Sequence, residues 1–135
     1  MEIYRLKKDI NLACVRAKSY PDGIQAAFDE LNRTFPSLEG RTLYGVSKPV
    51  NRKIVYKAGV TENSMRETKK HGCETFAIKK GTYLMETIQD YQSKLQTLAS
   101  VFQRLLSDPR LDETSCCVEW YKSDKELVCM VKIIE

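Results

Sequence analysis

One acidic residue stands alone in a strand-like segment near the C-terminus. Residues Ser115 to Lys122 read SCCVEWYK, and Glu119 is the only acid among cysteine, valine, tryptophan and tyrosine. A carboxylate surrounded by aromatic side chains loses hydration, which disfavours its charged form and leaves it in need of a positive partner. An organic cation would be such a partner. A plainer arrangement also fits the pattern, in which Glu119 points to water or meets a lysine across the sheet.

Six aromatic residues in strand-like segments are candidates for the wall of a cleft around such a cation. They are Tyr44, Tyr56, Phe76, Tyr83, Trp120 and Tyr121. Aromatic rings supply apolar area and a face that attracts cations, although aromatic residues on strands more often pack in a core. Tyr83 is a stronger candidate for this wall because Gly81 lies two positions before it. Trp120 is the neighbour of Glu119 and should therefore point to the opposite face of the strand.

The chain lacks the residue patterns of the common catalytic and metal sites. His71 is the only histidine, and no serine stands near it in a nucleophile-elbow context, so a histidine-based triad is not supported. Nucleotide-binding glycine motifs and the zinc-protease motif do not occur. The five cysteines form no C-x-x-C pair, and they indicate a reducing cytoplasm. We expect no metal and no cofactor, with Cys116 and Cys117 on opposite faces of one strand.

The elements that must position these residues begin with a strand, a helix and two further strands. Residues 11–17 alternate as a half-buried strand. Ser19 and Asp22 then have capping-box spacing. An apolar stripe at helical spacing follows, formed by Ile24, Ala27, Phe28 and Leu31. Residues 42–47 and 53–60 are β-prone and predict a hairpin.

A polar segment, residues 61–72, leads to a second half with the same order of elements. Residues 73–78 predict a strand that breaks at two lysines and a glycine and resumes at 82–85. Thr87 and Asp90 repeat the capping-box spacing. The strongest helical stripe of the chain follows, formed by Tyr91, Leu95, Leu98, Phe102 and Leu105.

The last two predicted strands, residues 115–122 and 126–134, complete a repeated β-α-β-β order. We therefore predict one α+β domain over residues 1–135, made of pseudo-repeats 9–60 and 73–135 with the polar segment as linker. Two such modules can pool their strands into one antiparallel sheet, with both helices covering one face.

Matching the hairpins of the two halves predicts where a ligand would bind. The match sets Leu43 to Val46 against Val118 to Tyr121, which puts Tyr44 and Glu119 in equivalent places. Pseudo-symmetric halves leave a groove where they meet, and ligand sites favour such junctions. We expect a central cleft there, with Glu119 as its anchor.

Seven short motifs, in the same order, resemble those of GyrI-like effector-binding domains. They are Tyr20-Pro21, Ala27 to Leu31 (AFDEL), Leu43 to Val46 (LYGV), Ala58-Gly59-Val60, Ile78 to Tyr83 (IKKGTY), Val118 to Tyr121 (VEWY) and Val131-Lys132-Ile133. The resemblance covers nearly the whole chain. It implies a domain that binds small, often cationic and aromatic molecules in a central cleft, with a ligand-contacting glutamate at Glu119.

The leading functional prediction is a stand-alone small-molecule-binding domain. It would act as a sensor or sequestering protein related to transcription regulators. The alternative, which the resemblance also brings in, is a small hydrolase of reactive molecules, with Glu119 as general base and Tyr83 as proton donor. A third function, inhibition of a protein through the surface, needs no cleft. Among these, a binding function is favoured over an enzyme.

The composition is that of a globular protein with a small positive charge. Hydrophobic residues make up 42% of the 135 residues and charged residues 30%. The apolar runs are too short for a membrane span and no secretory signal is present, so we expect a cytoplasmic protein without membrane contact. The net charge of +4 comes from lysines in turns and polar segments. We expect no specific DNA binding by this chain alone, while a protein partner or a homo-oligomer stays open.

Overall fold

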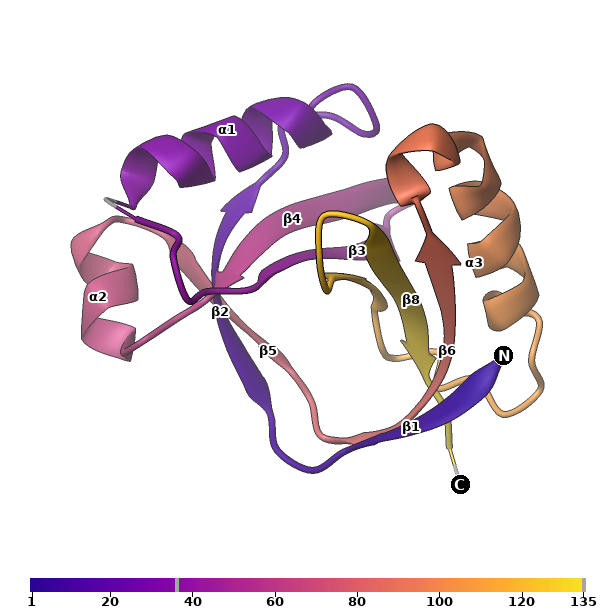
Figure 1. The fold of residues 1–135 in the computed structure, drawn as a ribbon. Coiled ribbons are helices and arrows are strands. Elements are labelled where there is room, and N and C mark those ends of the chain that lie inside the picture. The colour runs from indigo at the N-terminus through magenta and orange to yellow at the C-terminus, as the bar shows by residue number, and fades with distance from the viewer. Residues whose placement is uncertain (36, 135) are drawn as a thin grey trace.

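Eight strands form one antiparallel sheet in a computed structural model that describes residues 1–35 and 37–134 (Figure 1). The strands follow the order β1-β6-β8-β7-β3-β4-β2-β5 across the sheet. Their bounds are β1 Glu2–Leu6, β2 Ile10–Arg16, β3 Leu43–Val50, β4 Lys53–Thr61, β5 Glu74–Ile78, β6 Gly81–Gln89, β7 Cys117–Tyr121 and β8 Glu126–Lys132. The predicted α+β class with a single antiparallel sheet is confirmed.

Three helices accompany the sheet in the described part of the chain. They are α1 (Ile24–Thr34), α2 (Met65–Lys70) and α3 (Leu98–Leu106), and two short 3-10 turns, Tyr91–Ser93 and Leu95–Thr97, lead into α3. No helix among the described residues is long and apolar enough to span a membrane.

The two long helices cover the same face of the sheet, as predicted. One apolar cluster under α1 contains Leu31 and Tyr56, and another under α3 contains Leu105 and Cys129. Strand pairing links these clusters, because Tyr56 is opposite Ser47 and Ser47 is opposite Cys117, which packs against the α3 cluster. Figure 1 shows α1 and α3 set apart, with β3 and β8 visible between them.

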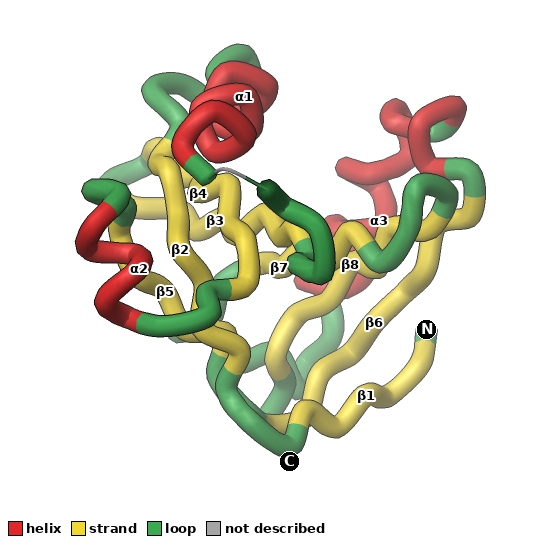
Figure 2. The backbone as a smooth tube through the Cα atoms, turned by 60° about the vertical axis from the view of Figure 1, so that its left-hand side comes forward, coloured by secondary structure: helices red, strands yellow, loops and turns green. Residues whose placement is uncertain are grey.

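The sheet curls so that its opposite face closes on itself (Figure 2). A third apolar cluster contains Leu12 and Ile78 from one end of the sheet and Tyr83 and Met130 from the other. Side chains from distant strands meet there because alternate residues of every strand point into the curl. We call this concave surface the inner face and the surface under the helices the helix face.

The leading strand of each half pairs with the other half. β1 precedes β2 in the chain but pairs with β6, while β5 precedes β6 but pairs with β2. The two crossing turns are held together, since Asp9 accepts a hydrogen bond from the backbone N–H of Lys80 at 2.8 Å and pairs with Lys79. Strand β1 was not predicted, because five residues with two charges carry a weak β signal.

Both predicted capping boxes are wrong. Helix α1 begins at Ile24, after Gly23, and no side chain caps it, so Ser19 lies in the preceding turn. Thr87 lies inside β6, where it pairs with Val128 of β8. The long predicted helix therefore starts later, at Leu98, because pairing between strands outweighs the local capping preference of one threonine.

Two local features differ from the predicted loops. The β3–β4 hairpin closes through a two-residue turn at Asn51 and Arg52, both with positive φ (51° and 69°), which suits the twist of paired strands. The polar segment 61–72 contains α2, whose first turn is capped by Ser64 accepting from the backbone N–H of Glu67.

The packing of α3 predicts that alanine substitutions at two neighbouring leucines lower the stability of the protein by very different amounts. Leu105 is 0% exposed beneath α3, whereas Leu106 is 44% exposed. Replacing Leu105 with alanine removes buried contacts and leaves a cavity, so we expect Leu105→Ala to lower the free energy of unfolding by about 2–5 kcal/mol. Leu106→Ala, the matched control, should lower it by less than about 1 kcal/mol. Urea unfolding measures both, and equal losses would contradict this orientation of α3.

Candidate functional site

The two halves meet where β3 pairs with β7. In this pairing Gly45 is opposite Glu119 and Ser47 is opposite Cys117. These four residues lie on the helix face, in the interval between the clusters under α1 and α3. We call this row the β3–β7 seam. Three of its side chains are small or absent, so the fourth, Glu119, is the only large group on its floor.

The Glu119 carboxylate is held by two tyrosines. The hydroxyl of Tyr56 on β4 donates to Glu119 Oε1 at 2.7 Å, and the hydroxyl of Tyr121 on β7 donates to the same oxygen at 2.9 Å. Among the described residues, no lysine or arginine forms an ion pair with Glu119. The plainer arrangement, in which a lysine across the sheet meets Glu119, does not occur there.

Gly45 makes the contact between Tyr56 and Glu119 possible. Tyr56 is on β4 and Glu119 on β7, so the tyrosine must reach across β3, which lies between them. A Cβ added at Gly45 would overlap the Tyr56 hydroxyl and lie 2.5 Å from Glu119 Oε1. The absent side chain is therefore a steric requirement of this hydrogen bond.

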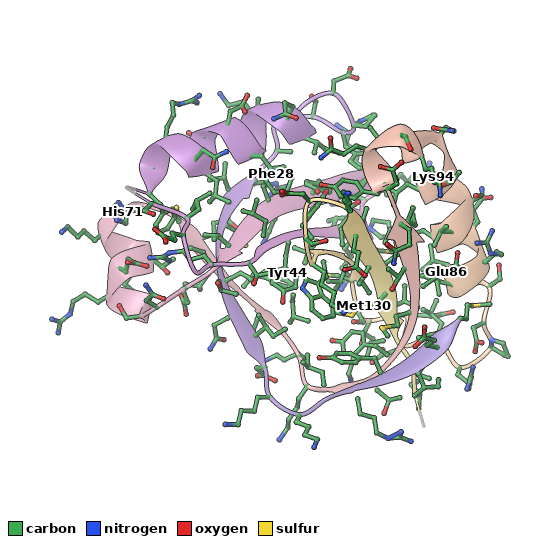
Figure 3. All side chains as sticks on the ribbon, viewed as in Figure 1. Phe28, Tyr44, His71, Glu86, Lys94 and Met130 are labelled. Atoms are coloured by element: carbon green, nitrogen blue, oxygen red, sulfur yellow. The ribbon has the colours of Figure 1, made fainter. Side chains whose placement is uncertain are left out.

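Aromatic rings from three other segments enclose the two tyrosines. Phe28 of α1 meets Tyr121 edge-on at 5.6 Å between ring centroids and Tyr56 at 6.3 Å. Tyr20, in the turn before α1, stacks on Tyr56 at 6.1 Å, and Tyr91 meets Tyr121 at 5.8 Å. Figure 3 labels Phe28 between α1 and the sheet.

Burial controls the protonation of this group of residues. Loss of hydration raises the pKa of Glu119 above its ordinary 4.5, and the hydrogen bonds from Tyr56 and Tyr121 act in the opposite direction. Burial and the nearby Glu119 charge also raise the pKa of Tyr56 and of Tyr121. Both tyrosines are therefore protonated donors at neutral pH, and among the described residues no lysine or arginine pairs with the carboxylate that they hold.

The other predicted wall residues lie on the inner face. Tyr44 and Trp120 are opposite each other there, and the expected equivalence of Tyr44 with Glu119 is wrong because the two side chains point to opposite faces. Phe76 and Tyr83 pack in the same inner cluster. The Tyr83 hydroxyl donates to the backbone carbonyl of Lys79 at 2.6 Å, so it does not reach Glu119.

Of the predicted wall residues, the structure thus brings Tyr56 and Tyr121 to Glu119. Sequence reasoning missed Tyr20, Phe28, Tyr91 and Gly45. Phe28 and Tyr91 were assigned to helical stripes, which indicate core packing. Tyr20 and Gly45 belong to two of the motifs that carry the family resemblance, but no pattern in the sequence assigned either residue to the site. Cys116 and Cys117 do lie on opposite faces, as predicted.

Comparison with known proteins places the fold among solved structures. No protein-family model matches this chain, and no curated protein matches its sequence. An integron cassette protein from the mobile metagenome of Vibrio cholerae is similar in structure, with a TM-score of 0.71 and 12% identity over 98% of this chain and 94% of its own.

Two further solved structures share the fold. SAV2435 bound to tetraphenylphosphonium has a TM-score of 0.66 at 11% identity, covering 98% of this chain and 92% of its own. A putative transcription regulation protein from Staphylococcus aureus has a TM-score of 0.63 at 10% identity, covering 99% and 97%. At such low identity the similarity concerns the fold.

Protonation of Glu119 makes the stability of the protein depend on pH. Because folding raises the pKa of this carboxyl, the folded state binds its proton more tightly than the unfolded state does. This contribution is therefore favourable below the ordinary value of 4.5 and is lost as pH rises through the folded pKa. We expect Glu119→Gln to be more stable than the wild type at pH 7, with an advantage that vanishes near pH 4.

Thermal unfolding from pH 4 to pH 8 measures this difference. The control is Glu39→Gln, which removes the same charge from an exposed loop position. A variant Glu119→Gln that is less stable than wild type at pH 7 would show that the ionised carboxylate stabilises the fold.

The steric requirement at Gly45 predicts how far one added methyl group lowers the stability of the protein. Gly45→Ala should lower the free energy of unfolding by about 1–3 kcal/mol, because the new Cβ forces the Tyr56 hydroxyl away from Glu119. Ser47→Ala, at the next position on the same face, adds no volume and should change it by less than about 1 kcal/mol. Urea unfolding with tyrosine absorbance reports both. A Gly45→Ala protein as stable as wild type would mean that Tyr56 can move without cost.

Proposed function

We propose that this protein binds organic cations in the β3–β7 seam, as a sensor or sequestering domain of the GyrI-like kind. The ionised Glu119 carboxylate supplies the opposite charge. The rings of Tyr20, Phe28, Tyr56, Tyr91 and Tyr121 supply apolar area and faces for the cation.

The observation that carries this proposal is a half-buried carboxylate that has two hydrogen-bond donors and, within the described part of the chain, no lysine or arginine paired with it. Tyrosine hydroxyls hold Glu119 Oε1 in place, but neutral donors do not replace a positive charge. Keeping an ionised group in such a site costs free energy that a bound cation would recover. The residues of this site therefore favour binding of a positively charged ligand and lower the stability of the protein without a ligand.

Four further observations support the proposal. SAV2435, which shares the fold, has been solved with the organic cation tetraphenylphosphonium, and another protein of this fold is described as a putative transcription regulation protein. The sequence motifs resemble those of GyrI-like domains along nearly the whole chain. Tyr20, which stacks on Tyr56, is 49% exposed, so one wall of the site can be reached from solvent.

A hydrolase is the second candidate function, and one observation favours it. Glu119 and a tyrosine hydroxyl are within hydrogen-bond distance, as a general base and its proton donor would be. The donor would then be Tyr56 or Tyr121, because Tyr83 lies on the other face. The two functions differ in the fate of the ligand: mass spectrometry of ligand that co-purifies with the protein recovers it intact from a binding protein and as cleaved products from a hydrolase.

Calorimetry with tetraphenylphosphonium tests the role of the Glu119 charge. Glu119→Gln keeps the shape of the side chain and both hydrogen bonds but removes the charge. We expect its affinity for the cation to fall by about 1–3 kcal/mol, the range for loss of a charge-assisted contact. Triphenylphosphine oxide, a neutral probe with the same aromatic rings, should lose far less.

The matched control for this experiment is again Glu39→Gln, which should bind tetraphenylphosphonium like the wild type. Equal losses for the charged and the neutral probe in Glu119→Gln would show that the charge does not anchor the ligand.

A further inference from the structure

A cavity of about 260 Å³ lies at the end of the β3–β7 seam, beside α3. Strand residues and the segment at the end of α3 line it together, among them Ser47, Ile54, Cys117, Val131, Leu106 and Leu111. Five of the lining residues are aliphatic (Pro49, Ile54, Leu106, Leu111 and Val131), and most of the surface that the lining exposes to the cavity is apolar. Ser47 and Cys117 are also members of the seam, so the cavity and the seam share part of their floor.

The cavity is one step along the strands from Glu119. The pair Ser47–Cys117 is the next pair after Gly45–Glu119 whose side chains point to the same face. Two residues of a strand span about 7 Å, which is the separation of these two pairs. The charge of Glu119 adds to burial in raising the pKa of the Cys117 thiol to about 11, so the two groups are electrostatically close.

The two regions differ in charge and in size. The charged residues in the cavity lining are Lys48, Lys132, Asp112 and Glu113, whose charges cancel. Lys132 pairs with Asp112 at 3.5 Å, and Lys48 donates to the backbone carbonyl of Thr114 at 2.9 Å. The cavity thus offers no excess charge to a cation, and its volume is just below the range of about 300–1,000 Å³ for a whole ligand. It suits an apolar part of a larger molecule.

We propose that the cavity holds the apolar tail of an amphipathic organic cation whose charged head lies against Glu119. This assignment rests on the proposed function, and it narrows the ligand class from organic cations in general to cations that carry an aliphatic chain. The head remains at the seam because the opposite charge is there, and the tail runs past Cys117 to Ile54 and Leu111.

A series of alkyltrimethylammonium ions from hexyl to decyl tests the tail, because the head stays constant while the chain grows. Each methylene that enters the cavity should tighten binding by about fourfold, the fold-change equivalent to about 0.8 kcal/mol. Benzyltrimethylammonium, which has no tail, serves as the head-only probe. Competition between this probe and the decyl compound should show one shared site for the head.

Filling the cavity should abolish the dependence on chain length. Ile54 lines the cavity and is 41% exposed, and tryptophan is common in β-strands, so Ile54→Trp should fold and occupy the space. We expect its gain per methylene to fall below about twofold, and its affinity for benzyltrimethylammonium to stay within about twofold of wild type. Val50→Trp is the matched control, since Val50 is 44% exposed on the same hairpin but does not line the cavity.

The outcomes separate this inference from the proposed function. If Glu119→Gln weakens benzyltrimethylammonium but Ile54→Trp keeps the chain-length dependence of wild type, the tail assignment is wrong and the cation site stands. If Glu119→Gln binds every cation as tightly as the wild type does, the proposed cation site is wrong. The proposal of a ligand with its head at Glu119 and its tail in the cavity is then wrong as well. If only Ile54→Trp loses the dependence on chain length, and Glu119→Gln binds all cations more weakly, then the cation site and the tail assignment are both supported.

Discussion

The pairing of β3 with β7 is the contact on which the other features of this protein depend. It joins two halves whose own strands would otherwise end at open edges, and the exchange of β1 and β5 between the halves adds a second link. Because both helices pack beside this junction on the same face, the interval between them becomes the natural place for a ligand. Glu119 is the charged residue that the pairing places there.

Stability and ligand binding make opposite demands at Glu119. A half-buried carboxylate with a raised pKa destabilises the folded protein at neutral pH, and a glutamine would satisfy Tyr56 and Tyr121 without that cost. The local structure nevertheless accommodates the acid, because the missing side chain of Gly45 leaves room for the Tyr56 hydroxyl and because Phe28 and Tyr20 pack against the Tyr56 ring. Such a conflict between local stability and a charged group is typical of a functional site.

The sequence predictions failed where a long-range pairing decided the outcome. Thr87 has a capping-box spacing, but its pairing with Val128 extends β6 through it. Tyr44 aligned with Glu119 in the matched hairpins, but a shift of one residue in such a match reverses the face of every side chain. Tyr83 and Phe76 were predicted as wall residues because they are aromatic and on strands, and the structure places both in the cluster of the inner face, on the side of the sheet away from Glu119.

The sequence by itself determined the order of the main strands and helices and the formation of one antiparallel sheet. It also determined that an isolated acid lies in an apolar strand. These features could be predicted because periodicity and composition are local properties. Tyr121 lies two residues from that acid on the same strand, but tertiary structure alone decided which other rings gather around the pair. Tyr56 reaches Glu119 from two strands away, Phe28 comes from a helix and Tyr20 from a turn, and no spacing along the chain encodes these contacts. They follow from strand register and helix placement, which depend on the packing of the whole domain.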